Sequence, residues 1–157
     1  MYERILVPLD GSKVGEAALP MIEGLITKFA PGLNVEVILF QAIAALSHWV
    51  VVGETGARIP YTGKEQELLK KEALDYLGKT GECLRKRGAI VRTLVTFGDA
   101  AAEILKSADE LGVDLIAMST HGRSGFGRLA FGSVTEWVLR SGSIPVLLVR
   151  TPRKPKA

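Results

Sequence analysis

Residues 4–29, RILVPLDGSKVGEAALPMIEGLITKF, pass from a short apolar run into a helical pattern. The run at residues 4–9 is typical of a strand that is buried on both faces of a sheet. After a turn at residues 10–12, apolar residues recur at three- and four-residue intervals, which predicts an amphipathic helix. Ser12 is the expected N-cap, and Pro20 is expected to kink the helix because proline removes a hydrogen bond inside it. A buried strand followed by an amphipathic helix is the repeating unit of α/β folds.

The same alternation of strand and helix continues along the chain. Further apolar runs predict strands at residues 35–40, 89–95, 113–118 and 144–149. Helical periodicity predicts helices at residues 64–87, 98–110 and 133–140. Residues 43–63 hold three glycines and Pro60, and we expect them to be irregular. Because alternating strands and helices pair in parallel through right-handed crossovers, the sequence predicts an α/β fold. It is an open, doubly wound, five-stranded parallel sheet with helices on both faces.

We expect one domain over residues 1–150 and a basic C-terminal tail at residues 151–157. The chain has 157 residues, of which 47% are apolar and one is cysteine, which argues against disorder and against a disulfide scaffold. The net charge is +3, and four basic residues between positions 150 and 156 account for it, since the charge is −1 without them. The folded body therefore has no basic excess, and we expect no nucleic-acid partner. No apolar run approaches the roughly 20 residues of a membrane span and no secretory signal is visible, so we expect no membrane partner and a cytoplasmic location.

The segment from Met118 to Thr135 is the candidate ligand site, because it leaves a predicted strand, contains four glycines and enters a predicted helix. Glycines let main-chain N–H groups approach an anion, and a helix N-terminus presents unpaired donors with a partial positive charge. Hydroxyl groups would add donors at Ser119, Ser124, Ser133 and Thr135. The pattern is compatible with phosphate binding, and the alternative is a flexible turn before an ordinary serine cap. Because doubly wound sheets bind ligands at the carboxyl ends of their strands, Asp10, Gln41–Ala42 and Gly98–Asp99 are further candidates.

Other nucleotide and metal signatures are not met. Gly78-Lys79-Thr80 resembles the end of a phosphate-binding P-loop, but Ala73 stands where that motif requires glycine, and the triplet lies inside a predicted helix. No G-x-G-x-x-G fingerprint follows the first predicted strand, which argues against NAD or FAD. Two histidines and Cys83 stand at unrelated positions that give no metal-site spacing, and Cys83 has no companion that implies nucleophilic catalysis.

Four segments resemble the universal stress protein family, and together they extend over essentially the whole chain: residues 7–12, 112–123, 132–136 and 144–149. The nucleotide-binding branch of that family has the pattern G-x2-G-x9-G-[S/T]. Gly122 matches the second glycine and Gly132-Ser133 the end of the pattern, whereas Ser119 stands in place of the first glycine. A serine Cβ is expected to hinder close approach of a ligand there. The resemblance implies a Rossmann-like fold of the adenine nucleotide α-hydrolase type.

The resemblance also implies roles for individual residues. Asp10 would lie near a ribose or a phosphate-bound metal, and main-chain groups at Ala42 would contact an adenine. His121 is expected to support the loop or to hydrogen-bond a phosphate rather than to transfer protons, and Arg123 to pair with phosphate oxygens. The full set of expected nucleotide-binding residues is Pro8, Asp10, Ala42, Met118, Ser119, His121, Gly122, Arg123, Ser124, Gly132, Ser133, Val134 and Thr135.

By this resemblance the chain is expected to bind ATP, with ADP or AMP as variants, and with Mg²⁺ carried on the nucleotide. The last predicted strand would form an apolar sheet edge, which is prone to aggregate unless it is paired. The resemblance supplies the partner, a homodimer through residues 144–149. We expect a nucleotide-responsive regulator of the stress response with little or no catalysis, and no enzyme. The alternatives are a dimer that binds no nucleotide and acts through protein partners, and a slow ATP hydrolase with Asp10 and His121 as candidate bases.

Overall fold

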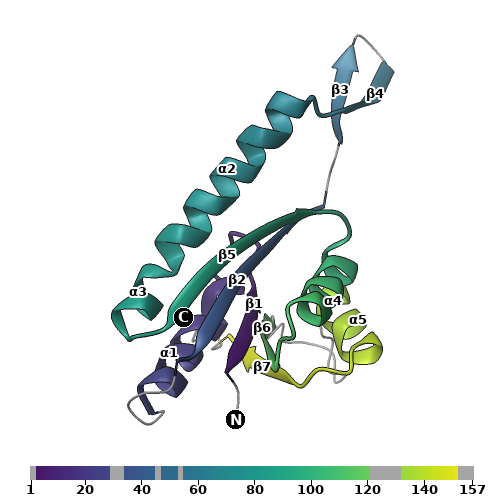
Figure 1. Ribbon diagram of the computed structural model, residues 1–157. Helices are drawn as coiled ribbons and strands as arrows, with labels where there is room; N and C mark the ends of the chain where they lie inside the picture. The colour runs from purple at the N-terminus through teal and green to yellow at the C-terminus, as the bar shows by residue number, and fades with distance from the viewer. Residues whose placement is uncertain (1–2, 29–33, 45–46, 53–54, 121–131, 152–157) are drawn as a thin grey trace, which may run out of the picture.

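A five-stranded parallel sheet forms the centre of the computed structural model (Figure 1). The structure describes residues 3–28, 34–44, 47–52, 55–120 and 132–151. The strands are β1 (Arg4–Pro8), β2 (Glu36–Ile43), β5 (Ile90–Phe97), β6 (Leu115–Thr120) and β7 (Val146–Arg150). Their order across the sheet is β5-β2-β1-β6-β7, and every neighbouring pair is parallel. The predicted α/β fold and its five strands are confirmed.

The central strands β1, β2 and β6 are apolar on both faces because helices cover both sides of the sheet (Figure 1). On one face lie α1 (Leu19–Lys28), α2 (Gly63–Thr80) and α3 (Glu82–Lys86). They contribute Ile22, Leu77 and Leu84 to a core cluster that includes Ile5 and Val7 of β1. On the other face lie α4 (Ala100–Glu110) and α5 (Ser133–Ser141), whose side chains pack around the intervening residue of β1, Leu6. The alternation of Ile5, Leu6 and Val7 between the two clusters explains why β1 is a continuous apolar run.

The first helix differs from its prediction at Pro20. A 3-10 helix, η1 (Gly15–Ala18), leads into α1, so that Pro20 is the second residue of α1. At that position a main-chain N–H has no acceptor within the helix, and proline therefore breaks no α-helical hydrogen bond. The expected mid-helix kink is replaced by a change from 3-10 to α-helix just before Pro20. The N-cap of η1 is Val14, which makes no side-chain capping bond, and not Ser12 as predicted. The Ser12 Oγ instead accepts a hydrogen bond from the Gly15 N–H at 3.0 Å within the turn that leads into η1.

The helix predicted over residues 64–87 is two helices, α2 and α3, which meet at Gly81. A Cβ on Gly81 would lie 2.8 Å from Val91 Cγ1 and 3.0 Å from Leu39 Cδ1. The chain thus approaches the sheet too closely for a larger residue, and it turns there. The periodic pattern could not reveal this break, because it depends on contact with β2 and β5.

Part of the segment expected to be irregular is paired: β3 (Ser47–Val52) and β4 (Thr55–Pro60) form an antiparallel hairpin. Figure 1 shows the hairpin projecting from the body, between the end of β2 and the start of α2. The first strand has an apolar, β-branched sequence, but the second contains Gly56, Ala57 and Pro60, which rarely occur in strands. The weak strand propensity of residues 55–60 explains why the pairing was not predicted.

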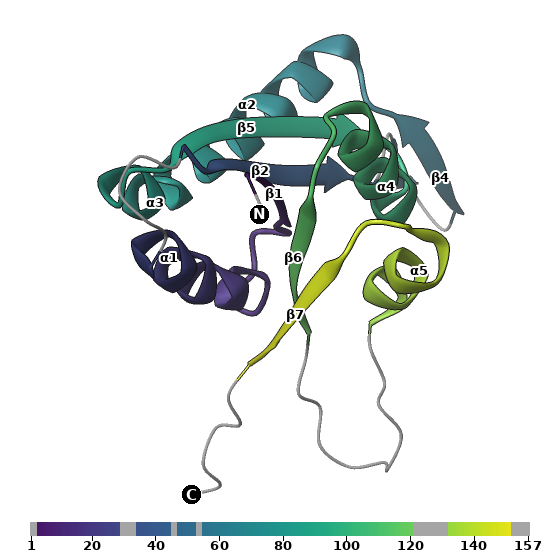
Figure 2. The ribbon, with the colours of Figure 1, turned by 60° about the horizontal axis from the view of Figure 1, so that its bottom comes forward.

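The strand order places β1 between β2 and β6. The chain proceeds from β1 to β2 and β5 on one side, and later to β6 and β7 on the other, so its direction across the sheet reverses beside β1. Doubly wound sheets bind ligands at the carboxyl ends of the strands at such a reversal. β7 is an outermost strand, as predicted (Figure 2). Within the described ranges, no helix is long and apolar enough to cross a membrane.

Candidate functional site

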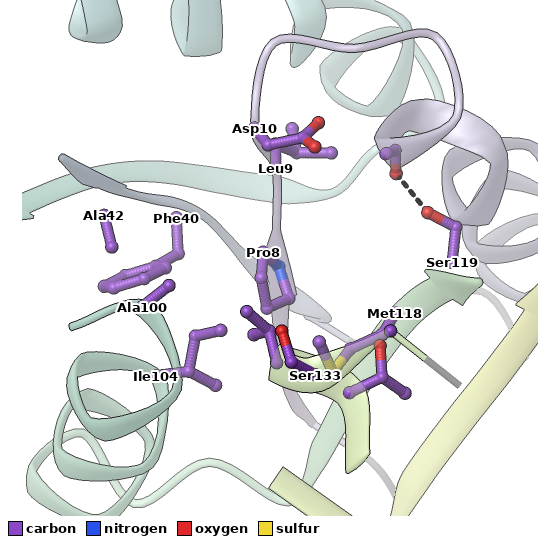
Figure 3. Close-up of a pocket in the computed structure, with 14 residues that line it drawn as sticks. Pro8, Leu9, Asp10, Phe40, Ala42, Ala100, Ile104, Met118, Ser119 and Ser133 are labelled. Carbon is purple, nitrogen blue, oxygen red and sulfur yellow. Dashed lines mark hydrogen bonds between the residues drawn. The ribbon is translucent and has the colours of Figure 1, made fainter. Parts of the chain in front are cut away.

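A pocket opens at the carboxyl ends of β1, β2 and β6, and the first turns of α4 and α5 complete it (Figure 3). Its volume is ≈ 250 Å³, just below the roughly 300–1,000 Å³ of typical small-molecule sites. Its lining includes nine of the expected nucleotide-binding residues: Pro8, Asp10, Ala42, Met118, Ser119, Gly132, Ser133, Val134 and Thr135. The remaining expected residues, His121, Gly122, Arg123 and Ser124, lie outside the described residues. Every described member of the predicted set therefore lies at one pocket.

The floor of the pocket is apolar. Phe40 on β2 is 1% exposed, Ile104 on α4 is 2% exposed and Met118 on β6 is 6% exposed. Figure 3 shows Phe40 and Ile104 gathered on one side of the pocket together with Ala42 and Ala100. These buried, rigid side chains present a surface that suits a planar heterocycle.

The first turn of α5 forms a polar wall. Its N-cap is Gly132, which has no side chain to accept a hydrogen bond, whereas α2 and α4 are each capped by a side-chain oxygen. The Glu136 N–H donates to the Gly132 carbonyl at 2.9 Å. The N–H groups of Ser133, Val134 and Thr135 precede it and have no acceptor within the helix. A helix start of this kind favours an anion.

Asp10 lies at the pocket mouth in a tightly hydrogen-bonded turn. Its Oδ1 accepts hydrogen bonds from the Ser12 N–H at 2.9 Å and from the Ser12 hydroxyl at 2.6 Å. The Ser12 Oγ in turn accepts from the Gly15 N–H at 3.0 Å. A Cβ on Gly15 would lie 2.4 Å from Asp10 Oδ1, so glycine is required for the carboxylate to occupy this position. Residues 10, 12 and 15 therefore fix the direction of the carboxylate.

Ser119, at the carboxyl end of β6, directs its hydroxyl toward this turn. The Ser119 Oγ donates a hydrogen bond to the Gly15 carbonyl at 2.8 Å (Figure 3). A hydroxyl has one proton to donate, and here the Gly15 carbonyl accepts it. The expectation that the Ser119 hydroxyl donates to a phosphate stays a prediction, and in this structure the hydroxyl donates to the Gly15 carbonyl.

Known proteins share the sequence pattern of this chain over almost its full length. Residues 1–150 match the model of the Universal stress protein family. The chain belongs to this family. Universal stress protein MJ0531 of Methanocaldococcus jannaschii is 30% identical over 98% of this chain and 85% of its own length. Universal stress protein MJ0577 of the same organism is 31% identical over 96% of each chain.

Solved structures of this family share the fold. The structure of MJ0577 has a TM-score of 0.71 and 30% identity, covering 99% of both chains. The universal stress protein of Archaeoglobus fulgidus in complex with dAMP has a TM-score of 0.60 and 21% identity, over 94% of this chain and 97% of its own. A universal stress protein in complex with cAMP has a TM-score of 0.61 and 19% identity, over 95% and 97%. At these identities the last two show the common fold alone.

Five lining residues of this universal stress protein were not predicted: Leu9, Gly15, Phe40, Ala100 and Ile104. Ala100 and Ile104 could have been found, because they lie one helical turn apart directly after Gly98–Asp99, a strand end that the topology had already indicated. The sequence gives no corresponding signal for Gly15. Its role depends on the closeness of Asp10 Oδ1, which only the folded turn shows.

The Asp10 turn is also bound to α2. The Tyr76 hydroxyl donates to Glu16 Oε1 at 3.1 Å, and Glu16 Oε2 pairs with Lys13 Nζ at 2.8 Å. Burial raises the pKa of Tyr76 to about 12, and the carboxylates of Glu16 and Asp10 act in the same direction. Tyr76 is therefore a neutral hydrogen-bond donor at physiological pH.

Stability at alkaline pH should depend on Tyr76. Its folded-state pKa of about 12 lies above the ordinary value of 10.0, so the stabilising contribution is complete below pH 10 and is lost as the pH rises toward 12. In Tyr76→Phe this contribution is absent. We expect the free energy of unfolding in urea to fall more steeply between these pH values in the wild type than in the variant. Parallel pH profiles of the two proteins would contradict this prediction.

Proposed function

We propose that this universal stress protein binds an adenine nucleotide in the pocket, preferably ATP, with ADP or AMP as variants. The observation that carries the proposal is the convergence of the predicted residues on one cavity with an apolar floor and a helix start without a side-chain cap. The base would lie on Phe40 and Ile104, the ribose near Asp10, and the phosphates at the first turn of α5. The complexes of two proteins of this fold with cAMP and dAMP support an adenine ligand.

The groups that line the pocket can account for micromolar affinity. Micromolar binding needs about 8 kcal/mol. Charge-assisted hydrogen bonds contribute roughly 1.5–3 kcal/mol each, so the N–H groups at the start of α5 must act together with base burial. Among the described residues, no group of three or more His, Cys, Asp or Glu side chains is placed to hold a metal. Mg²⁺ would therefore be held mainly by the phosphates of the nucleotide.

Calorimetric titration of the purified protein with Mg-ATP tests the proposal, with Mg-GTP as the control for base selectivity. We expect micromolar binding that is selective for adenine. The protein must first be shown by acid extraction to be free of nucleotide. No heat from nucleotide-free protein would exclude nucleotide binding, and equal affinity for both nucleotides would exclude adenine selectivity.

We further propose that nucleotide binding regulates a cytoplasmic stress-response protein and that catalysis is slow or absent. ATP hydrolysis needs a positioned water and a base. Asp10 Oδ1 already accepts two hydrogen bonds from Ser12, which makes this oxygen a poor base. Release of inorganic phosphate from saturating Mg-ATP should therefore be negligible on the time scale of binding. Rapid multiple turnover would contradict this part of the proposal.

The open edge of β7 is the proposed dimer interface. Pro145 O accepts from the Ile116 N–H and Thr151 N donates to Thr120 O, both on β6. Main-chain groups alternate in direction along a strand, so those of Leu148 point away from β6, toward the open edge. A second copy of β7 could pair there and cover the edge.

Leu148→Pro is expected to convert the dimer into a monomer, because proline removes an outward N–H group. Leu148→Ala is the matched control, since it loses the same side-chain packing but keeps the N–H group. Light scattering coupled to size exclusion should give a dimer for the wild type and the alanine variant, and a monomer for the proline variant. A dimeric Leu148→Pro protein, or a monomeric wild type, would contradict the β7 interface.

The alternative function is a dimer that acts through protein partners without nucleotide. Ser119 favours it, because a serine replaces the first glycine of the nucleotide pattern and lines the pocket. The Ser119 hydroxyl is directed toward the Gly15 carbonyl, which weakens this argument against nucleotide binding.

A further inference from the structure

A chain of hydrogen bonds connects Asp10 with the end of β6. It runs from Asp10 Oδ1 to Ser12, from the Ser12 Oγ to the Gly15 N–H, and from the Gly15 carbonyl to the Ser119 hydroxyl, over distances of 2.6–3.0 Å. The first and last of these residues both line the pocket. The two walls of the pocket that come from β1 and β6 are thereby joined.

The turn that holds Asp10 lies at the surface. Asp10, Gly11 and Lys13 are exposed. Among the described residues, Ser119 from β6 and Tyr76 from α2 reach it from outside by hydrogen bonds. Tyr76 contacts Glu16, beyond Gly15, whereas Ser119 contacts the residue that is itself bonded to Ser12. Of these two contacts, the one made by Ser119 lies closer to the Asp10 carboxylate along the chain of hydrogen bonds.

We propose that Ser119 is a positioning residue for Asp10: its hydroxyl fastens the turn after β1 to the end of β6 and holds the carboxylate toward the ribose side of the pocket. Ser119 does not contact the ligand through this hydroxyl. It acts through Gly15 and Ser12, which transmit its position to Asp10. The nucleotide arm of the test rests on the proposed function, whereas the arm based on amide exchange does not.

Amide hydrogen exchange of the ligand-free protein tests the connection itself. The Ser12 and Gly15 amides are the donors within the turn. In Ser119→Ala we expect both to exchange roughly two- to tenfold faster, the effect of one lost hydrogen bond. Ser119→Thr keeps a hydroxyl and should restore the wild-type rates. Ser143→Ala, an exposed serine outside the pocket, is the control. Unchanged exchange in Ser119→Ala would overturn the proposal, even if ATP does not bind.

Nucleotide affinity then distinguishes positioning from a general structural role. ATP and 2′,3′-dideoxy-ATP differ only in the ribose hydroxyls, which are the groups that Asp10 would contact. Ser119→Ala should bind ATP roughly two- to tenfold more weakly and dideoxy-ATP with unchanged affinity. Adding Ser119→Ala to Asp10→Asn should cause no further loss, because residues that act through one another are not additive. Equal losses for both nucleotides, or additive losses in the double variant, would overturn the proposal.

Discussion

Gly15→Ala is expected to weaken ATP binding by at least about tenfold, corresponding to the roughly 1.5–3 kcal/mol of a charge-assisted hydrogen bond. The added Cβ would lie 2.4 Å from Asp10 Oδ1, a distance that no carbon–oxygen contact sustains. The carboxylate must therefore leave Ser12 and turn away from the ribose side of the pocket. Because Asp10 is exposed, this rotation should cost the fold less than about 1 kcal/mol. Calorimetry with Mg-ATP and urea unfolding measure the two effects separately.

Gly24→Ala is the matched control for this variant. Gly24 lies inside α1, and a Cβ there would meet no atom within 4 Å. Alanine inside a helix is more stable than glycine by roughly 0.5–1 kcal/mol. We expect Gly24→Ala to be slightly more stable than the wild type and to bind ATP with the same affinity. If Gly15→Ala also binds ATP normally, Asp10 does not contact the nucleotide from its present position.

The central strands β1, β2 and β6 were predictable because they are covered on both faces. Residues 5–7 and 37–40 are fully buried or nearly so, and such strands appear in the sequence as unbroken apolar runs. The helices were predictable where their apolar residues form a single stripe that packs against the sheet. Local periodicity failed where a tertiary contact decides the structure, as at Gly81, whose position against Val91 and Leu39 divides one predicted helix into two.

The candidate site was predictable at the level of strand ends and not at the level of side-chain direction. Topology alone brings the residues after β1, β2 and β6 to one edge of the sheet. The hydroxyl of Ser119, however, bonds a main-chain carbonyl 104 positions away in the sequence. Since any residue has such a carbonyl, no pattern of residue types can indicate this partner. From the sequence, the serine in place of a motif glycine therefore suggested a weakened site. In the structure, the same serine connects the end of β6 with the turn after β1.

Phe40→Ala should combine the largest loss of stability with a loss of binding. Phe40 is 1% exposed, belongs to the core on the α4 and α5 face of the sheet, and also lines the pocket. Truncation of a buried phenylalanine costs about 3–5 kcal/mol, against a total of about 5–15 kcal/mol for a typical domain. The same change removes the flat surface on which the base would lie. Urea unfolding with and without ATP, at one protein concentration, measures both consequences.

Leu77→Ala provides the comparison that separates core packing from binding. Leu77 on α2 is 0% exposed and lies in the core on the opposite face of the sheet. Its truncation costs about 2–5 kcal/mol, so both variants should unfold at lower urea concentrations. A ligand at one hundred times its dissociation constant stabilises the folded state by about 2.7 kcal/mol. ATP should raise the free energy of unfolding of Leu77→Ala by this amount, and that of Phe40→Ala by little or nothing. Equal stabilisation of both variants by ATP would place the base away from Phe40, whereas no stabilisation of Leu77→Ala would contradict nucleotide binding by the folded protein.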